Sequence, residues 1–430
     1  MKYRGEIMET LLCLSVALFA GLMLSRVAKK FQLPAVTAYL VAGILIGPYF
    51  LGALGVNGLG FNSMENIDAY DIIPDVALGF IAFSIGNEFR LSQLKKIGKQ
   101  ATVIGIAQAL VTCLVVDAAL IGVHYIAPDK LSLPAAVTLG AVATATAPAA
   151  TLMVVKQYKA KGPLTSLLLP IVALDDAVGL MVFAVSFGVA KALIVGSVDV
   201  ISIVIEPILE VILSILLGTL MGVLFTFSEK FFHSRSKRLA MSVTFVFLTV
   251  SLSMLKFEIG GVHIAFSSLL SCMMLGTIFC NICDFSEELM DRVDRWTAPL
   301  LILFFVISGA ELELSIFRDA GIVLIGIIYI LTRCVGKYFG ASISAKATNC
   351  DKNIVKYLGI TLFPQAGVAL GMAIKAAELG PEGTVVANIT LFAVLIYELI
   401  GPFLTKVSLQ KAGEIKPEGK VSARSENVKA

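Results

Sequence analysis

The sequence predicts an all-α membrane protein with about 13 transmembrane helices, in which inverted repeats bring two broken helices together in a core. Three observations lead to this prediction. The 430-residue chain is 57% hydrophobic and only 15% charged, whereas soluble domains average about 25% charged residues. Its apolar residues gather in runs of roughly 20, the length of a helix that crosses the bilayer. Two of these runs carry a proline near the middle.

Each apolar run is expected to be a helix, because backbone groups in lipid must bond to one another. The N-terminal run is expected to be retained as a first helix, since Glu6 and Glu9 interrupt its basic start. The polar tail, 408–430, is expected to be disordered. The segments are 9–28, 34–51, 72–90, 100–123, 134–155, 164–192, 201–227, 239–256, 261–280, 296–312, 319–343, 354–376 and 385–407.

The loops between the segments differ in charge. Loops after odd-numbered segments hold most of the lysines and arginines, as in RVAKK, KQYKAK and SEKFFHSRSKR, whereas the loop at 52–71 is acidic. Basic loops remain on the cytoplasmic side of a membrane. The N-terminus is therefore expected outside and the C-terminus in the cytoplasm.

Two adjacent acids, Asp175 and Asp176, lie inside the sixth segment in the stretch ALDDAVGL. Asp175 is expected about 16 Å from the cytoplasmic end at the helical rise of 1.5 Å per residue, close to the middle of the bilayer core. An acid there costs about 2.5–3.5 kcal/mol on insertion scales. We interpret the pair as a site for a transported ion or proton. The alternative is a structural pair held by neighbouring helices.

Two basic residues, Arg333 and Lys337, lie in the eleventh segment. The lysine chain is long enough to reach the depth of the aspartates, so Lys337 is a candidate partner for Asp175. The alternative is that it extends to the lipid headgroups. Gly336 and Gly340 flank the lysine and are expected to let another helix approach closely.

Prolines interrupt the fifth and twelfth segments at matching places. Pro148 removes a backbone donor within TATAPAAT, and Pro364, followed by Gln365, does the same within LFPQAGVALG. Freed carbonyls near the midplane are typical of cation sites in carriers, and matched breaks in two halves indicate an inverted repeat. The breaks are therefore expected to lie near the acid pair.

These stretches together resemble the monovalent cation:proton antiporter superfamily, in the sodium/hydrogen exchanger group that has an adjacent Asp-Asp pair. The resemblance covers nearly the whole chain and rests on TATAPAAT, ALDDAVGL, FFVISGAEL, RCVGK and LFPQAGVALG. The acid pair combined with R-x-x-G-K is its most specific part. Ala147 stands where another branch has an acid, which favours the Asp-Asp branch, usually electrogenic when the lysine is kept.

The resemblance implies a role for each matching residue. Asp176 matches the carboxylate that binds the cation, here Na⁺, in competition with the proton. Asp175 matches the acid paired with the lysine at 337, and Thr146 matches a position that lines the site. In such proteins two sets of helices form a mobile core, two form a dimerising scaffold and one links them. The corresponding ranges are 100–192 and 319–407 for the core, 9–90 and 239–312 for the scaffold, and 201–227 for the link.

The predicted function is secondary active transport, not enzymatic catalysis. The protein is expected to exchange Na⁺, or Li⁺, for H⁺ by alternating access and to serve pH homeostasis. A K⁺/H⁺ antiporter or K⁺ efflux system on the same fold is the alternative. An intramembrane aspartyl protease is a remote one, because no second buried acid stands in a G-x-G-D setting.

The expected partners are these ions, membrane lipid and a second copy of the chain in a homodimer. A plasma or inner membrane is the expected location. No phosphate loop and no dinucleotide fingerprint occur in the sequence, so neither a cofactor nor nucleic acid is expected.

Overall fold

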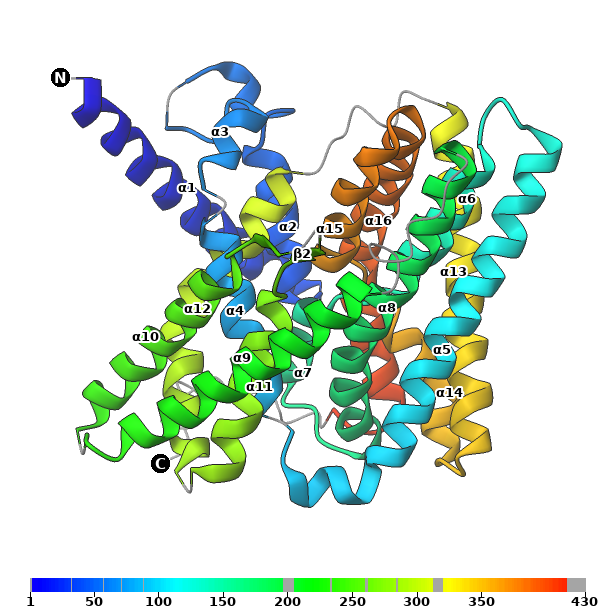
Figure 1. The fold of residues 1–430 in the computed structure, drawn as a ribbon. Coiled ribbons are helices and arrows are strands. Elements are labelled where there is room, and N and C mark those ends of the chain that lie inside the picture. Colours follow the sequence, from blue (N-terminus) through cyan, green and yellow to red (C-terminus); the bar gives the residue numbers. More distant parts are fainter. Residues whose placement is uncertain are drawn as a thin grey trace.

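A computed structural model of the protein describes residues 2–415, apart from 32, 57, 71, 88, 196–204, 233, 260–261, 284 and 312–319. Within these residues the chain is almost entirely helical, and long helices run between two opposite ends of the molecule (Figure 1). The side chain of Asp176 lies outside the described part.

In the first half of the chain each predicted segment contains one described helix, except 134–155, which contains two. The 3₁₀ helix Gly52–Leu54 and the short α3 (Met64–Asp68) connect α2 to α4. The longer helices are α1 (Lys2–Lys30), α2 (Ala35–Ile46), α4 (Ile72–Asn87), α5 (Leu91–Ile126), α6 (Leu133–Val142), α7 (Pro148–Tyr158) and α8 (Pro163–Val195).

In the second half, the predicted segment 354–376 likewise contains two described helices. A 3₁₀ turn at Ala377–Leu379 precedes the last helix. The helices are α9 (Glu206–Glu229), α10 (Arg235–Ser253), α11 (Ser268–Ile282), α12 (Ser286–Ala310), α13 (Ala320–Ala347), α14 (Lys352–Thr361), α15 (Gly367–Ala376) and α16 (Pro381–Lys411).

Several boundaries differ from the sequence prediction, and α5 and α12 begin earlier than the predicted starts at 100 and 296. Residues 262–267 are not helical, because β1 (Phe257–Ile259) pairs antiparallel with β2 (Val262–Ile264). A Gly-Gly pair between two short apolar runs favours such a hairpin, and α11 begins only after Ser267, whose hydroxyl accepts a bond from the amide of Leu270.

The sequence prediction also puts the start of the disordered tail, at 408, too early. Residues 408–411 continue α16, because Leu409 is buried against neighbouring helices. The carboxylate of Glu414 then accepts bonds from the amides of Leu164 and Thr165 at the start of α8, at 2.6 and 2.8 Å. These amides lack partners within their own helix, so the acid ties the end of the chain to α8. The remainder of the tail, 416–430, lies outside the described residues.

Among the described residues, seven helices are long and apolar enough to cross a membrane: α1, α5, α8, α9, α12, α13 and α16. Four further apolar helices, α2, α4, α6 and α11, are shorter. Most residues of α2 and α4 are buried by other helices. Helix ends at membrane depth are tolerated where protein encloses them, so the short helices fit a polytopic fold.

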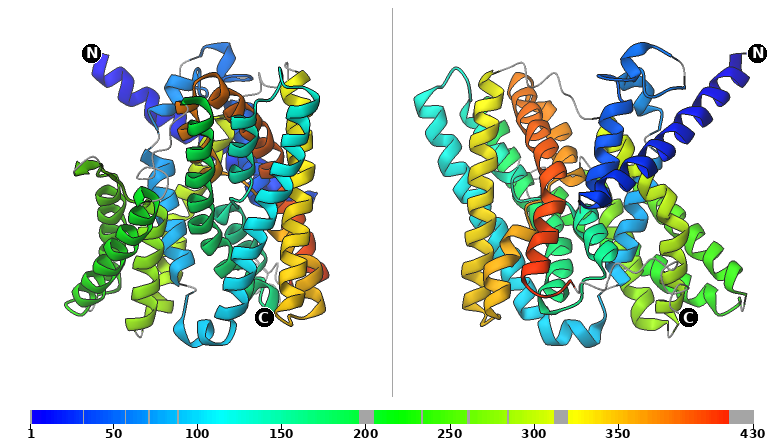
Figure 2. Two further views of the ribbon diagram at one scale, coloured as in Figure 1. Left: turned by 45° about the vertical axis from the view of Figure 1, so that its right-hand side comes forward. Right: turned by 180° about the vertical axis from the view of Figure 1, so that it is seen from behind.

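The helices pack as two groups (Figure 2). The first group consists of α1, α2, α4 and α9–α12, and the second group of α5–α8 and α13–α16. Both halves of the chain contribute to each group. Segments that are far apart in the sequence therefore lie side by side, such as α2 with α12 and α5 with α13.

Glycines allow the closest approaches inside each group. In the first group, a Cβ atom built on Gly43 of α2 would lie 2.0 Å from the carbonyl oxygen of Val306 of α12. In the second group, Cβ atoms on Gly336 and Gly340 of α13 would lie 2.7 and 2.9 Å from backbone atoms of α5. The prediction that these two glycines admit a neighbouring helix is thus confirmed. Each group is packed backbone against backbone.

We expect Gly43→Val to destabilise the protein, because its side chain would collide with the backbone of α12. Overpacking of this kind costs about 1–3 kcal/mol. Thermal unfolding in detergent should show a clearly lower melting temperature. Gly122→Ala is the control, since no atom lies within 4 Å of a Cβ built there. Equal melting temperatures for the two variants would contradict the packing described above.

Candidate ion and proton site

The two interrupted segments cross at their breaks. α6 ends at Val142 and α7 begins at Pro148, whose missing N–H suits the first position of a helix. The amide of Ala147 donates to the carbonyl of Pro364 at 2.8 Å, and Gln365 Nε2 donates to the carbonyl of Val142 at 2.9 Å. The structure therefore brings the predicted break residues Pro148, Pro364 and Gln365 together.

Arg333 of α13 binds the carbonyls that the breaks release. Its side chain is fully buried and donates to the carbonyls of Ala143, Ala145 and Phe363 at 2.9, 2.6 and 2.7 Å. Its guanidinium also lies 4.5 Å from the ring centre of Tyr397. Carbonyls at helix C-termini carry partial negative charge, so one cation serves both interrupted segments.

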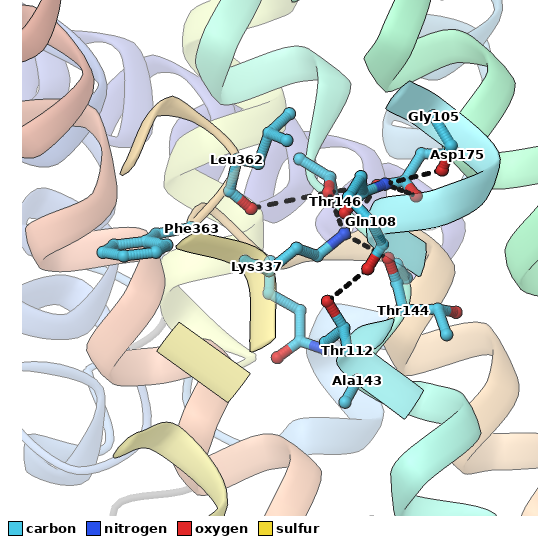
Figure 3. Close-up of polar contacts among 12 residues, drawn as sticks. Gly105, Gln108, Thr112, Ala143, Thr144, Thr146, Asp175, Lys337, Leu362 and Phe363 are labelled. Atoms are coloured by element: carbon cyan, nitrogen blue, oxygen red, sulfur yellow. Dashed lines mark hydrogen bonds and ion pairs between the residues drawn. The ribbon is translucent and has the colours of Figure 1, made fainter. Parts of the chain in front are cut away.

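Lys337 forms a fully buried ion pair with Asp175. Its Nζ lies 2.7 Å from Asp175 Oδ2, and both side chains have no exposed surface. The ammonium also donates to the carbonyl of Thr144 at 2.5 Å and to the hydroxyl of Thr146 at 2.9 Å (Figure 3). Its three donors therefore have three oxygen partners at the first break. The alternative, a lysine that extends to the headgroups, does not fit this geometry.

The carboxylate of Asp175 has further partners. The hydroxyl of Thr146 donates to Oδ2, and Nε2 of Gln108 on α5 donates to Oδ1 (Figure 3). Gln108 was not among the residues predicted from the sequence. Its only signal there is a single amide inside the apolar stretch GIAQALV. A buried amide must find a partner, so this residue could have been proposed as a neighbour of the acids.

Asp176 follows Asp175 in α8. Because its side chain lies outside the described residues, its role as the cation- and proton-binding carboxylate stays a prediction. Among the described residues, no group of three or more His, Cys, Asp or Glu side chains is arranged to hold a metal ion. The described geometry thus presents a buried ion pair between the helix breaks.

Comparison with known proteins identifies the family. Residues 14–411 match the model of the family described as "Sodium/hydrogen exchanger, transmembrane". The chain belongs to this family.

Two relatives match this family member along nearly their whole length. The Na⁺/H⁺ antiporter NhaS4 of Synechocystis sp. is 23% identical over 92% of this chain and 95% of its own. The K⁺/H⁺ antiporter subunit KhtU of Bacillus subtilis is 24% identical over 92% of this chain and 94% of its own.

Solved structures share the fold. The sodium proton antiporter MjNhaP1 of Methanocaldococcus jannaschii at pH 8 aligns with a TM-score of 0.66 and 19% identity, over 95% of this chain and 97% of that chain. A second structure of MjNhaP1, from electron microscopy, aligns with a TM-score of 0.74 and 17% identity, over 94% and 98%. The all-α antiporter fold predicted from the sequence is thus confirmed.

Family membership makes the protein a multi-pass membrane transporter that exchanges monovalent cations for protons, not an enzyme. The remote alternative of an intramembrane aspartyl protease is excluded on the same ground. The buried ion pair and the crossed breaks lie in the part of the chain that the family model covers.

We expect Lys337→Met to lower the stability of the protein, because it leaves Asp175 buried without its cation. Breaking a buried pair by removing one partner costs about 3–5 kcal/mol. Adding Asp175→Asn should recover part of this loss, since the unpaired charge is then gone. Melting temperatures in detergent should fall in the order wild type, double variant, single variant.

The matched control for this series is Lys130→Met, which removes an exposed lysine. Its melting temperature should equal that of the wild type. A double variant less stable than Lys337→Met would show that the two residues act independently.

Proposed function

We propose that the protein exchanges Na⁺ for H⁺ at Asp176, with Asp175 and Lys337 as the adjoining switchable pair and Thr146 lining the site. The observation that carries this proposal is the fully buried Lys337–Asp175 ion pair beside the crossed helix breaks. Asp175 directly precedes Asp176 in the sequence, so a cation bound by Asp176 competes with Lys337 for Asp175.

The physical basis is the cost of a bare charge in a medium of low dielectric constant. A buried carboxylate without a counter-charge takes up a proton or a cation. A site that cannot cross the membrane empty therefore couples the two flows. When the cation enters, Asp175 turns from Lys337 toward it, and the released lysine loses its proton. This second proton would make the exchange electrogenic.

Sodium is the proposed cation, with lithium as its nearest substitute. Support comes from the family description and from the relative NhaS4. Potassium is the second candidate, because KhtU, a K⁺/H⁺ antiporter subunit, is similar over the same share of the chain. Proton-flux assays in vesicles with sodium, lithium and potassium in turn would decide between them.

We further propose that the second helix group is the mobile core and that the first group is the scaffold of a homodimer, with α9 as the link. The close backbone packing inside each group supports two bodies that move as units. The proposed orientation has the N-terminus outside and the C-terminus in the cytoplasm of a plasma or inner membrane, as the basic loops predict.

The end of α7 supplies polar links between the two groups. Lys156 Nζ lies 2.6 Å from Asp294 Oδ1 of α12, and Ser84 of α4 donates to the same oxygen at 3.2 Å. The amide of Ala35 donates to Gln157 Oε1 at 2.9 Å. Since α7 belongs to the proposed core, these contacts must separate when access changes sides. They act as a latch at the cytoplasmic end.

We expect Asp176→Asn to abolish exchange while the protein remains folded, because an amide can neither take up a proton near neutral pH nor neutralise a cation. The measurement is cation-dependent proton flux in vesicles that contain the purified variant. Asp129→Asn, which changes an exposed acid, should retain wild-type flux. Sodium-dependent proton flux retained by Asp176→Asn would overturn the assignment.

We expect Asp294→Asn to loosen the latch. The Lys156–Asp294 pair is about one-third exposed, so its loss costs only about 0.5–1 kcal/mol, or a roughly two- to five-fold shift between conformations. The amide of Ala35 should then exchange its hydrogen with deuterium faster by a similar factor. Asp291→Asn, an exposed acid on the same helix, is the control. Unchanged exchange at Ala35 in Asp294→Asn would show that the pair does not hold the groups together.

A further inference from the structure

Asp117 of α5 is an acid inside the second helix group that the mechanism above does not use. It lies nine residues after Gln108, which binds Asp175, and nine residues before the end of α5 at Ile126. At the helical rise each interval is about 14 Å. Asp117 is thus halfway between the level of the ion pair and the end of the molecule where α5 leads into α6.

The carboxylate occupies a place that the fold leaves open for it. A Cβ atom built on Gly140 of α6 would lie 1.8 Å from Asp117 Oδ1, so any other residue at 140 would displace the acid. Oδ1 is buried and has no hydrogen-bond partner in the described part of the protein. Oδ2 accepts a bond from the thiol of Cys113 at 3.3 Å. A weak thiol donor is the whole of its described support.

Among the described side chains of the neighbouring helices, no cation pairs with Asp117. α6 carries no titratable residue, and α8 and α13 pack on the other sides of α5. The described titratable and charged side chains of these helices in this part of the core have other partners. On α13, Lys337 binds Asp175, Arg333 binds backbone carbonyls, Tyr329 binds Gln365 and Cys334 contacts Tyr397. On α8, Lys191 pairs with Glu378, and on α5, His124 contacts the carbonyl of Leu131.

The position of Asp117 connects it to the ion pair. Gly140 lies in the last turn of α6, and Thr144, two residues beyond the end of that helix, accepts a bond from Lys337 through its carbonyl. A helix C-terminus carries partial negative charge and disfavours a second negative charge beside it. One carboxylate and one thiol are too few ligands for a hard cation, which needs several oxygens. The ligand that fits is a proton.

We infer that Asp117 is a second proton-binding site, whose charge controls how tightly the Lys337–Asp175 site holds protons. The inference rests on the proposed role of that pair. When Asp117 is ionised, its negative charge stabilises the ammonium of Lys337 across the end of α6. When Asp117 takes up a proton from water, an O–H bond forms, the charge disappears, and the central site releases its proton more readily.

Asp117→Asn tests this coupling in vesicles. The amide fixes the uncharged form, so the central site binds protons less tightly, and protons compete with the cation only at lower pH. The pH of half-maximal exchange should move down by up to about one unit, the size expected for unit charges about 14 Å apart at an effective dielectric constant of about 20. Asp117→Glu should restore most of the shift, and Asp129→Asn should leave the profile unchanged.

Infrared difference spectra recorded across a pH step provide a readout that needs no transport. The wild type should show the carbonyl band of a protonated carboxyl that disappears as pH rises, and Asp117→Asn should lack one such band. This band should persist in the double variant Lys337→Met with Asp175→Asn, in which the ion pair has no carboxyl left to produce it. Loss of exchange in that variant then concerns the ion pair, and loss of the band concerns Asp117. An unchanged band pattern and an unchanged pH profile in Asp117→Asn would overturn the inference. So would a lowered profile that Asp117→Glu fails to restore.

Discussion

The buried ion pair between Lys337 and Asp175 is the interaction on which the rest of the structure depends. Taking two charges out of water costs several kcal/mol for each ion even after relaxation, and neither side chain has any exposed surface. The surrounding structure must therefore supply polar partners. It does so with the carbonyl of Thr144, the hydroxyl of Thr146 and the amide of Gln108. Without interrupted helices there would be no free carbonyl at this depth.

The same constraint explains Arg333. Two helices that stop inside the membrane leave carbonyls without partners at both breaks, and each such group is costly in a medium without water. One guanidinium with a fixed fork of donors reaches three of them. The breaks, the arginine and the ion pair thus form one connected unit, because carbonyls of the breaks bind both Arg333 and Lys337.

The two helix groups differ in how they are packed inside and where they meet. Inside each helix group glycines bring backbones into contact, which leaves little freedom for sliding. Between the groups, Lys156 and Gln157 make polar contacts, and apolar residues such as Ala147 and Leu169 share a buried cluster with residues of the first group. The closest backbone contacts thus lie inside the groups, whereas side chains make the contacts between them.

The sequence by itself determined the helical membrane fold, since apolar runs of this length have no other stable form in lipid. It also determined where two of the helices break, because Pro148 and Pro364 remove donors wherever the chain goes. It pointed to a beginning of α11 that was wrong, and it placed the disordered tail too early. A short local hairpin outweighed hydropathy in the first case, and the tertiary contact of Glu414 with the start of α8 outweighed polarity in the second.

Only the tertiary structure decided how these parts meet. Lys337 and Asp175 are 162 residues apart, and the sequence left open whether the lysine points inward or to the headgroups. Gln108 joined the site, and Asp117 was placed beside Gly140, only because α5 packs against α6, α8 and α13. Composition and periodicity report what one helix does in lipid. Which polar residues of different helices come into contact depends on how the helices pack, and packing is a property of the assembled fold.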